Sequence, residues 1–339
     1  MVLQVWKDIK KGKIEPVYCI YGKELYLIQE TVSLLKKAVV EEGTKDFNFS
    51  VFDLEEESIG YAIEDAETFP FMGDKRLVIA KNPSFLSTEK KKDKIDHPLD
   101  RLETYIKTPA PYTVFILYAP YEKLDERKKV TKLLKKEASM VEAKELSGSD
   151  LTEFTLNLVA AENKTMQPEA AQELLMLTSG NLSAIAQEVK KLCTYKINQE
   201  DITVDDVNTL VARNLEQNIF ELINKIVSKK RTEALQIFYD LIKQKEEPIK
   251  MLALIMNQFR LIHHVKYFQK QGYGQKHIAS NIKIHPFRVK LALDQARLFS
   301  EHELTEISKT LAEMDYEMKS GKRDKQLILE LFLLNVLKS

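Results

Sequence analysis

The hydrophobic pattern of the chain changes once, near residue 150, and this change limits the folds it can adopt. Before residue 150, short apolar runs alternate with segments whose apolar residues recur every three or four positions. These two patterns are typical of buried strands and of helices. After residue 150 only the helical spacing remains. Strands that alternate with helices predict βαβ units and a parallel sheet. We therefore expect an α/β domain followed by all-α domains.

The periodicity also predicts where the elements lie. The expected strands are residues 16–21, 47–51, 77–80, 113–118 and 140–143, and the expected helices between them are residues 25–41, 57–68, 98–107 and 122–137. We expect three or four helices in 150–212 and five or six in 215–338. The very polar run 89–94 is expected to be a solvated loop. Ser147, Gly148 and Ser149 break the pattern, and the predicted domains are residues 1–146, 147–212 and 213–339.

Length and charge narrow the class of protein. A chain of 339 residues is too long for one ordinary core. Lys plus Arg equals Asp plus Glu, at 51 each, and this zero net charge argues against strong nucleic-acid binding by the chain alone. No apolar run has the length of a signal peptide or membrane helix, so a cytoplasmic location is expected. Two cysteines without a CxxC spacing predict no zinc site.

The first strand is followed by Gly22, Lys23 and Glu24, where a nucleotide-binding protein would have its phosphate loop. Such a loop has the form GxxxxGK[ST], whose backbone N–H groups surround the phosphates and whose hydroxyl holds magnesium. Here the loop is too short, and Glu24 would repel phosphate. Nor does an acidic pair follow the strand at 113–118 to hold magnesium through water. We predict a degenerate phosphate loop and no cofactor. The motifs GxSxG, HExxH and CxxC are also absent from the sequence, which argues against an enzyme.

Four apolar residues crowd the connection between the expected helix 57–68 and the next strand: Phe69, Pro70, Phe71 and Met72. Pro70 disfavours helix at the residue before it, and Gly73 and Asp74 then favour a turn. Two interpretations are open. The side chains could pack into the core, which is the simpler outcome for a monomer. Alternatively they form an exposed apolar tip, and exposed apolar patches mark interfaces.

Residues 275–290 predict a short helix, a turn and a second helix that begins near Pro286. The spacing resembles a helix-turn-helix, with basic side chains that could contact phosphates at Lys276, Lys283, Arg288 and Lys290. An ordinary helical corner is the simpler interpretation. A freestanding DNA-binding or regulatory protein that uses this element is the alternative function.

Five stretches in this order resemble the delta-subunit family of the bacterial DNA polymerase III clamp loader. They are PVYCIYGKELYLI, FPFMGDKRLVIAKN, YEKLDERKKVTKLLKK, LTSGNLSAIAQEVKKLCTY and EEPIKMLALIMNQFRLI. The resemblance covers the whole chain. It implies an AAA+-like first domain with a degenerate phosphate loop, a helical lid and a helical collar that mediates oligomerisation.

The resemblance also implies a function. Members of this family join the tau or gamma motor subunits and the delta-prime subunit in a ring within the replisome. They bind and open the beta sliding clamp so that it can be loaded onto primed DNA, without hydrolysing ATP themselves. The family's clamp-binding pair falls on Pro70 and Phe71, flanked by Phe69 and Met72. Some relatives have leucine where Pro70 stands, so Phe71 is the surer anchor. The resemblance favours the exposed interpretation of this segment.

Overall fold

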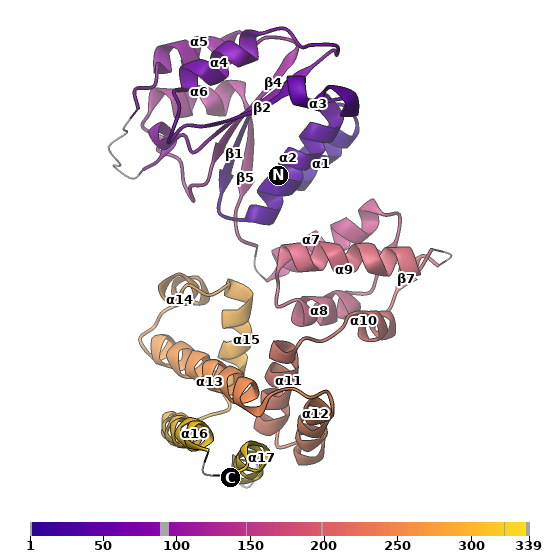
Figure 1. Cartoon of the computed structure of the whole chain (residues 1–339), viewed down its shortest axis with the longest axis vertical. Coiled ribbons are helices and arrows are strands. Elements are labelled where there is room, and N and C mark those ends of the chain that lie inside the picture. Colours follow the sequence, from indigo (N-terminus) through magenta and orange to yellow (C-terminus); the bar gives the residue numbers. More distant parts are fainter. Residues whose placement is uncertain (1, 89–94, 147, 198, 322, 337–339) are drawn as a thin grey trace. The chain divides into compact units, whose positions relative to one another are not determined.

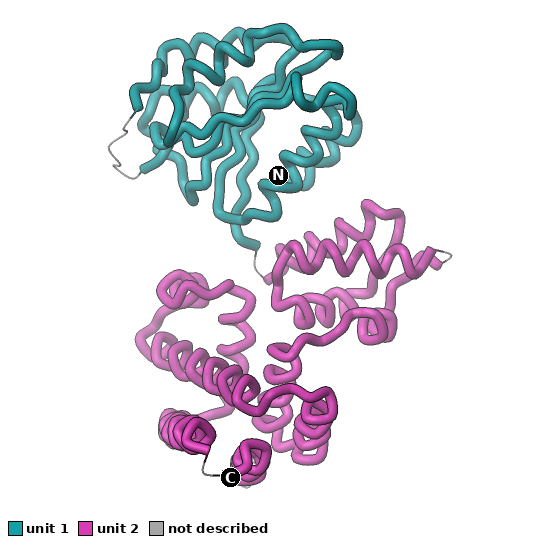
Figure 2. Tube along the Cα trace, in the orientation of Figure 1, with its two compact units in different colours: residues 1–146 teal, residues 147–339 magenta. Residues whose placement is uncertain are grey.

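The protein divides into two compact units, Met1–Leu146 and Ser147–Ser339, which are described separately (Figure 2). The computed structural model describes residues 2–88, 95–146, 148–197, 199–321 and 323–336. The polar run 89–94 lies outside the described residues. Among the described helices, none is both long and apolar enough to cross a membrane.

A parallel five-stranded sheet forms the centre of the first unit, in the order β2-β3-β4-β1-β5 (Figure 1). Its strands are β1 (Val17–Gly22), β2 (Phe49–Asp53), β3 (Arg76–Lys81), β4 (Thr113–Ala119) and β5 (Ser139–Ala143). Neighbouring strands are parallel throughout. The three inner strands are buried almost continuously, which explains why they read as unbroken apolar runs.

Helices cover both faces of this sheet (Figure 1). One face packs against α4 (Ile59–Glu67), α5 (Leu99–Lys107) and α6 (Lys129–Glu137), and the other against α1 (Val2–Lys10) and α2 (Leu25–Val39). The short helix α3 (Lys45–Asn48) precedes β2, and 3-10 turns occupy Glu42–Thr44 and Ser84–Leu86. The parallel α/β architecture predicted from the sequence is confirmed.

Two details of the first unit differ from the sequence prediction. Helix α6 begins at Lys129, whereas the periodicity placed its start at residue 122. The Asp125 carboxylate accepts hydrogen bonds from the Arg127 backbone N–H (3.1 Å) and guanidinium Nε (2.9 Å), and this local turn competes with helix. Helix α1 was not predicted. It buries Val2, Trp6 and Ile9 at helical spacing, and Trp6 Nε1 donates to Thr31 Oγ1 at 2.7 Å.

The second unit is mostly helical. Its first helices are α7 (Ser149–Ala161), α8 (Pro168–Leu177), α9 (Leu182–Tyr195) and α10 (Val204–Leu210). They are followed by α11 (Leu215–Val227), α12 (Arg231–Lys243), α13 (Pro248–Lys270), α14 (Gln275–Ile282), α15 (Pro286–Ala296), α16 (Glu301–Ser320) and α17 (Lys325–Val336). The main apolar cluster of this unit joins α11, α12, α13, α16 and α17.

Two predictions for the second unit need correction. A two-residue parallel pair, β6 (Thr165–Met166) and β7 (Asp201–Ile202), lies among the first helices, so this region is not all α. A strand of two residues is too short to show alternation in a sequence. The described part of 215–338 holds the helices α11 to α17, one more than the upper end of the prediction. Whether residues 147–212 and 213–339 are separate domains stays a prediction.

Candidate functional site

Three segments meet at the edge of the sheet where strands β2, β3 and β4 begin. We call this the amino edge. Phe47 and Asn48 precede β2, residues 68–75 precede β3, and Tyr112 precedes β4. Because neighbouring parallel strands start at the same edge, segments far apart in the sequence come together here. The predicted apolar segment 69–72 therefore lies beside residues that the sequence alone did not connect with it.

The apolar tip, which we define as residues 69–72, points its largest side chains outward. Phe69 is 75% exposed, Phe71 53% and Met72 79%, while Pro70 is half-buried. The core-packing interpretation of this segment is therefore wrong. Phe47, from α3, is 59% exposed and adjoins the same surface. Large apolar side chains gathered in this way are unusual on a monomer and typical of a protein-binding surface.

Aromatic neighbours support both phenylalanines of the tip. The Phe71 ring lies 5.1 Å from the Phe47 ring, centroid to centroid, and the Phe69 ring lies 4.5 Å from that of Tyr112. The Tyr112 hydroxyl donates to the Glu67 carbonyl at 2.8 Å, which holds that ring against the end of α4. Such ring pairs are worth about 0.5–1.5 kcal/mol beyond their buried area. The exposed rings are thus held in place on one side and open on the other.

The buried side chain of Asn48 holds the backbone of the tip. Its Nδ2 donates to the Phe71 carbonyl at 2.8 Å, and its Oδ1 accepts from the Phe71 N–H at 2.7 Å. The next residue, Met72, has a φ of 49°, in the left-handed region that side chains rarely adopt. A Cβ on Gly73 would come within 3.1 Å of Asn48 Nδ2, so the chain turns tightly over the amide.

Arg76 ties the elements around the tip together. It is 6% exposed, and its guanidinium donates to the Asp65 carbonyl (3.0 Å) and to the Phe47 carbonyl (3.0 Å). It also forms an ion pair with the Asp65 carboxylate. One side chain at the start of β3 thereby joins the end of α4 to α3. These contacts hold the backbone on both sides of the surface that carries the apolar residues.

The predicted degenerate phosphate loop, Gly22 to Glu24, lies at the opposite, carboxyl edge of the sheet, where β1 and β5 end. Gly22 has a φ of 131°, and a Cβ there would lie 2.0 Å from the Ala143 carbonyl oxygen. The Glu24 N–H donates to that same oxygen at 3.0 Å. Only Lys23 and Glu24 separate β1 from α2. The chain passes directly from strand to helix and leaves no loop to surround a phosphate.

The start of α2 is already occupied by a carboxylate of the chain. Glu24 is the N-cap, and its Oε1 accepts from the Tyr26 N–H at 3.3 Å. Helix N-termini bind phosphate through such N–H groups. Burial raises the pKa of Glu24, and the nearby Glu145 raises it further against the opposing effect of the Tyr26 N–H. Lys23 points to Glu122, 3.4 Å away, and both side chains are exposed. At the start of α2 the N–H of Tyr26 is therefore paired with a side chain of the protein itself, and Lys23 lies next to a glutamate.

The segment 275–290 has the helix, turn and helix that the sequence predicts. Helix α14 ends at Ile282, Lys283 turns the chain with a φ of 54°, and α15 begins at Pro286. Lys276, Lys283 and Lys290 are exposed. Arg288 differs from them because it is half-buried and its Nη2 lies 2.7 Å from Glu216 Oε1.

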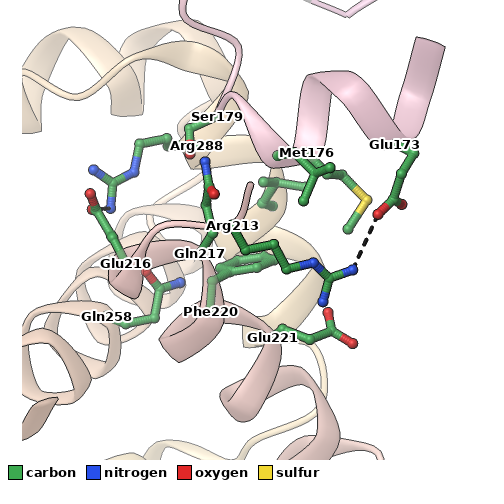
Figure 3. Close-up of a pocket in the computed structure, with 12 residues that line it drawn as sticks. Glu173, Met176, Ser179, Arg213, Glu216, Gln217, Phe220, Glu221, Gln258 and Arg288 are labelled. Atoms are coloured by element: carbon green, nitrogen blue, oxygen red, sulfur yellow. Dashed lines mark hydrogen bonds and ion pairs between the residues drawn. The ribbon is translucent and has the colours of Figure 1, made fainter. Parts of the chain in front are cut away.

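A cavity of about 220 Å³ lies beside Arg288, between α8, α11, α13 and α15 (Figure 3). Two ion pairs line it: Arg213 with Glu173, 3.3 Å apart, and Arg288 with Glu216. An anion entering here would have to displace a glutamate from its arginine. Among the described residues, no group of three or more histidine, cysteine or acidic side chains is placed to hold a metal ion.

The chain is similar to known proteins in both sequence and structure. The family described as "DNA polymerase III, delta subunit" matches residues 18–144, and "DNA polymerase III delta subunit, C-terminal domain" matches residues 216–336. The DNA polymerase III subunit delta of Bacillus subtilis (strain 168) is 67% identical over 338 residues, which cover 100% of this chain and 97% of that protein. A probable DNA polymerase III subunit delta of Aquifex aeolicus is 26% identical over 269 residues, 76% of this chain and 73% of that protein. The solved structure of the Bacillus subtilis DNA clamp loader delta protein, also 67% identical, superposes with a TM-score of 0.89 over the full length of both chains.

Proposed function

Because this chain belongs to the DNA polymerase III delta-subunit family, we propose that it binds and opens the beta sliding clamp during replication. In this proposal the chain is a non-catalytic accessory subunit of the clamp loader. It works with the tau or gamma motor subunits and the delta-prime subunit, and the opened clamp is loaded onto primed DNA. The observation that supports the proposal most directly is the apolar tip, with Phe71 as its anchor.

The tip has the properties of a binding anchor. Its apolar side chains face solvent, so they can bury new area on a partner. Asn48 holds its backbone at Phe71, and Arg76 holds the flanking residues Asp65 and Phe47. Preorganisation of this kind reduces the entropy lost on binding. Moving a phenylalanine from water into a pocket contributes about 1.5–3 kcal/mol. Central anchors can contribute more because their neighbours exclude water.

The carboxyl edge supports the second part of the proposal, that this subunit does not hydrolyse ATP. The close approach of Gly22 to Ala143 and the capping carboxylate of Glu24 occupy the place of a phosphate loop. ATP bound by neighbouring motor subunits would then control when the tip is exposed in the ring. The free energy for opening would come from binding of the tip to the clamp. A ligand shifts a conformational equilibrium by the difference in its affinity for the two states. The tip would therefore bind the open clamp more tightly than the closed clamp.

Release of a closed clamp from circular DNA tests this proposal. Clamp is first loaded onto nicked circular DNA and then incubated with the isolated chain in the absence of ATP. We expect wild type to release the clamp and Phe71→Ala to lose this activity. Leu25→Ala is the matched control, because Leu25 is also an exposed apolar residue of the first unit but lies at the carboxyl edge. A wild-type chain that binds clamp tightly yet leaves it on the circle contradicts the opening role.

The region 213–339 is proposed as the collar through which the chain joins its neighbours. Helix α17 exposes Leu327, Leu331 and Leu334, spaced four and three residues apart along one side. A chain that ends at residue 212 should still bind clamp but should no longer associate with the motor subunits. Co-elution of this shortened chain with the motors, as efficient as that of the full chain, contradicts the collar assignment.

Contacts with primed DNA within the complex are proposed for Lys276, Lys283 and Lys290. The ion pair of Arg288 with Glu216 makes Arg288 a weaker member of that set. The alternative function, a freestanding DNA-binding protein, predicts that the isolated chain binds DNA with a steep salt dependence. The clamp-opening proposal predicts that the isolated chain binds DNA weakly. Its Lys plus Arg equals its Asp plus Glu, at 51 each, so it has no net charge to attract phosphates.

A further inference from the structure

Asn48 is a buried polar side chain whose two hydrogen bonds serve only the apolar tip. It is 0% exposed, and its amide donates to the Phe71 carbonyl and accepts from the Phe71 N–H across 23 residues of sequence. We propose that helix α3 is part of the clamp-binding site: Asn48 is a positioning residue that holds Phe71 in its binding conformation, and Phe47 contacts the clamp beside Phe71. This inference rests on the proposed function.

The tip needs such a residue because its apolar side chains could also fold back onto the protein surface. A loop with three large exposed apolar groups gains free energy by folding them onto the protein surface. A terminal amide can oppose this, since it offers both a donor and an acceptor to one peptide unit, as a neighbouring strand would. Asn48 pairs with both the N–H and the C=O of Phe71 and thereby excludes conformations in which that residue turns inward.

The residues around the amide are consistent with a built contact. Met72 adopts a left-handed φ of 49° directly after the paired residue. Gly73 passes so close that a Cβ would lie 3.1 Å from Asn48 Nδ2. Arg76 donates to the Phe47 carbonyl, so the residue before Asn48 is held as well. The outward ring of Phe47, 59% exposed and 5.1 Å from the Phe71 ring, then extends the apolar surface from a second element.

Positioning and contact residues have different effects on binding kinetics. Loss of a positioning residue lowers the fraction of molecules that are competent to bind, so the apparent affinity falls by that fraction. The association rate constant then decreases while the dissociation rate constant changes little. Loss of a contact residue acts mainly on the dissociation rate constant. A residue with a merely structural role changes neither constant as long as the protein stays folded.

The experiment measures both rate constants for the full-length chain on immobilised beta clamp, well below the unfolding temperature. Asn48→Ala should lower the association rate constant about ten-fold, since two hydrogen bonds to Phe71 are lost. Gly73→Ala keeps Asn48 but crowds its amide, and should lower the same constant by a smaller factor. Phe47→Ala should instead raise the dissociation rate constant about ten-fold. Hydrogen exchange of the Phe71 amide should accelerate in Asn48→Ala.

Thr31→Val is the matched control. Thr31 is buried in the same unit, and its hydroxyl accepts from Trp6 Nε1 at 2.7 Å, so the substitution also removes a buried hydrogen bond. It should leave both rate constants and the Phe71 amide unchanged. If Asn48→Ala and Gly73→Ala associate like Thr31→Val while Phe71→Ala still weakens binding, the positioning role is overturned and the proposed function stands. An unchanged dissociation rate constant in Phe47→Ala overturns the contact role of α3. If Phe71→Ala binds like wild type, the proposed function fails, and this inference fails with it.

Discussion

At both edges of the first unit's sheet, hydrogen bonds hold the backbone of the connecting segments, but the two edges present different surfaces. At the amino edge, Asn48 and Arg76 fasten the backbone and leave Phe69, Phe71 and Met72 facing solvent. At the carboxyl edge, where open α/β sheets usually bind ligands, Gly22 and Glu24 pack directly against the Ala143 carbonyl at the end of β5. One edge of the sheet thus closes the chain where a phosphate loop would lie, and the other holds apolar side chains toward solvent.

The largest expected effect concerns the tight approach at the carboxyl edge. Gly22→Ala places a Cβ 2.0 Å from the Ala143 carbonyl oxygen at a φ of 131°, and should lower the free energy of unfolding of the first unit by more than about 3 kcal/mol. Trp6, the one tryptophan of the chain, reports unfolding of this unit in urea by its fluorescence. Gly12→Ala is the control, since Gly12 also has a positive φ but no atom within 4 Å of its Cβ position. Equal losses in the two variants contradict the crowding argument.

The amino edge should respond in the opposite way. Phe71→Ala should weaken clamp binding about ten- to a hundred-fold, by the burial of one phenylalanine. It should lower the free energy of unfolding by only about 0.5–1.5 kcal/mol, because the side chain is 53% exposed and its loss removes mainly the ring contact with Phe47. Phe115→Ala is the contrasting variant. Phe115 is fully buried in β4, so its truncation should cost about 3–5 kcal/mol of stability. A large stability loss in Phe71→Ala is the result that contradicts an exposed anchor.

A smaller effect follows from the ionisation of Glu24. Burial holds the pKa of this carboxyl above its ordinary value of 4.5. The folded state therefore binds the proton more tightly than the unfolded state. The associated stability is fully present below pH 4.5 and is lost as the pH rises through the raised pKa. Glu24→Gln has no proton to lose, so its stability relative to wild type should increase between pH 4 and pH 7, as urea unfolding can measure. A constant difference over this range contradicts a raised pKa.

The smallest expected effect is on nucleotide binding. A labelled ATP analogue should show no saturable binding to the isolated chain at micromolar concentrations, and Lys23→Ala should leave that result unchanged. The Lys23 side chain already lies 3.4 Å from Glu122, and Glu24 adds negative charge at the start of α2. Equilibrium dialysis with a motor subunit as the positive control measures this. Saturable binding that Lys23→Ala abolishes means that the carboxyl edge still accepts a phosphate.

The sequence predicted the alternation of the first unit well because its inner strands are buried on both faces. It did not predict the start of α6, since Leu124 and the residues after it keep a helical spacing and the competing turn depends on the side chain of Asp125. It also left α1 unassigned, although Val2, Trp6 and Ile9 have the right spacing. Thr31, the hydrogen-bond partner of Trp6, lies in another helix, where no local pattern marks it.

For the candidate site, sequence reasoning found the apolar residues but not what surrounds them. The pattern of 69–72 is the same for a buried loop and for an exposed tip, and resemblance to a family was needed to favour exposure. Phe47 was assigned to a strand, and Asn48 was not considered. Both join the site through the amino edge of the sheet, and a contact across 23 residues leaves no periodic signal. The ion pair of Arg288 with Glu216 was missed for the same reason.

The position of β1 in the sheet has a consequence for synthesis on the ribosome. This strand is made first but pairs only with β4 and β5, which begin at Thr113 and Ser139. At translation rates of about 5–20 residues per second, roughly 5–20 seconds pass before either neighbour exists. During that time an apolar strand with two unpaired edges is exposed to other chains, a known route to aggregation. We therefore expect nascent chains stalled before residue 113 to need chaperones to stay unaggregated. Chains stalled beyond residue 180 should not need them. The risk of aggregation is then confined to the first seconds of synthesis.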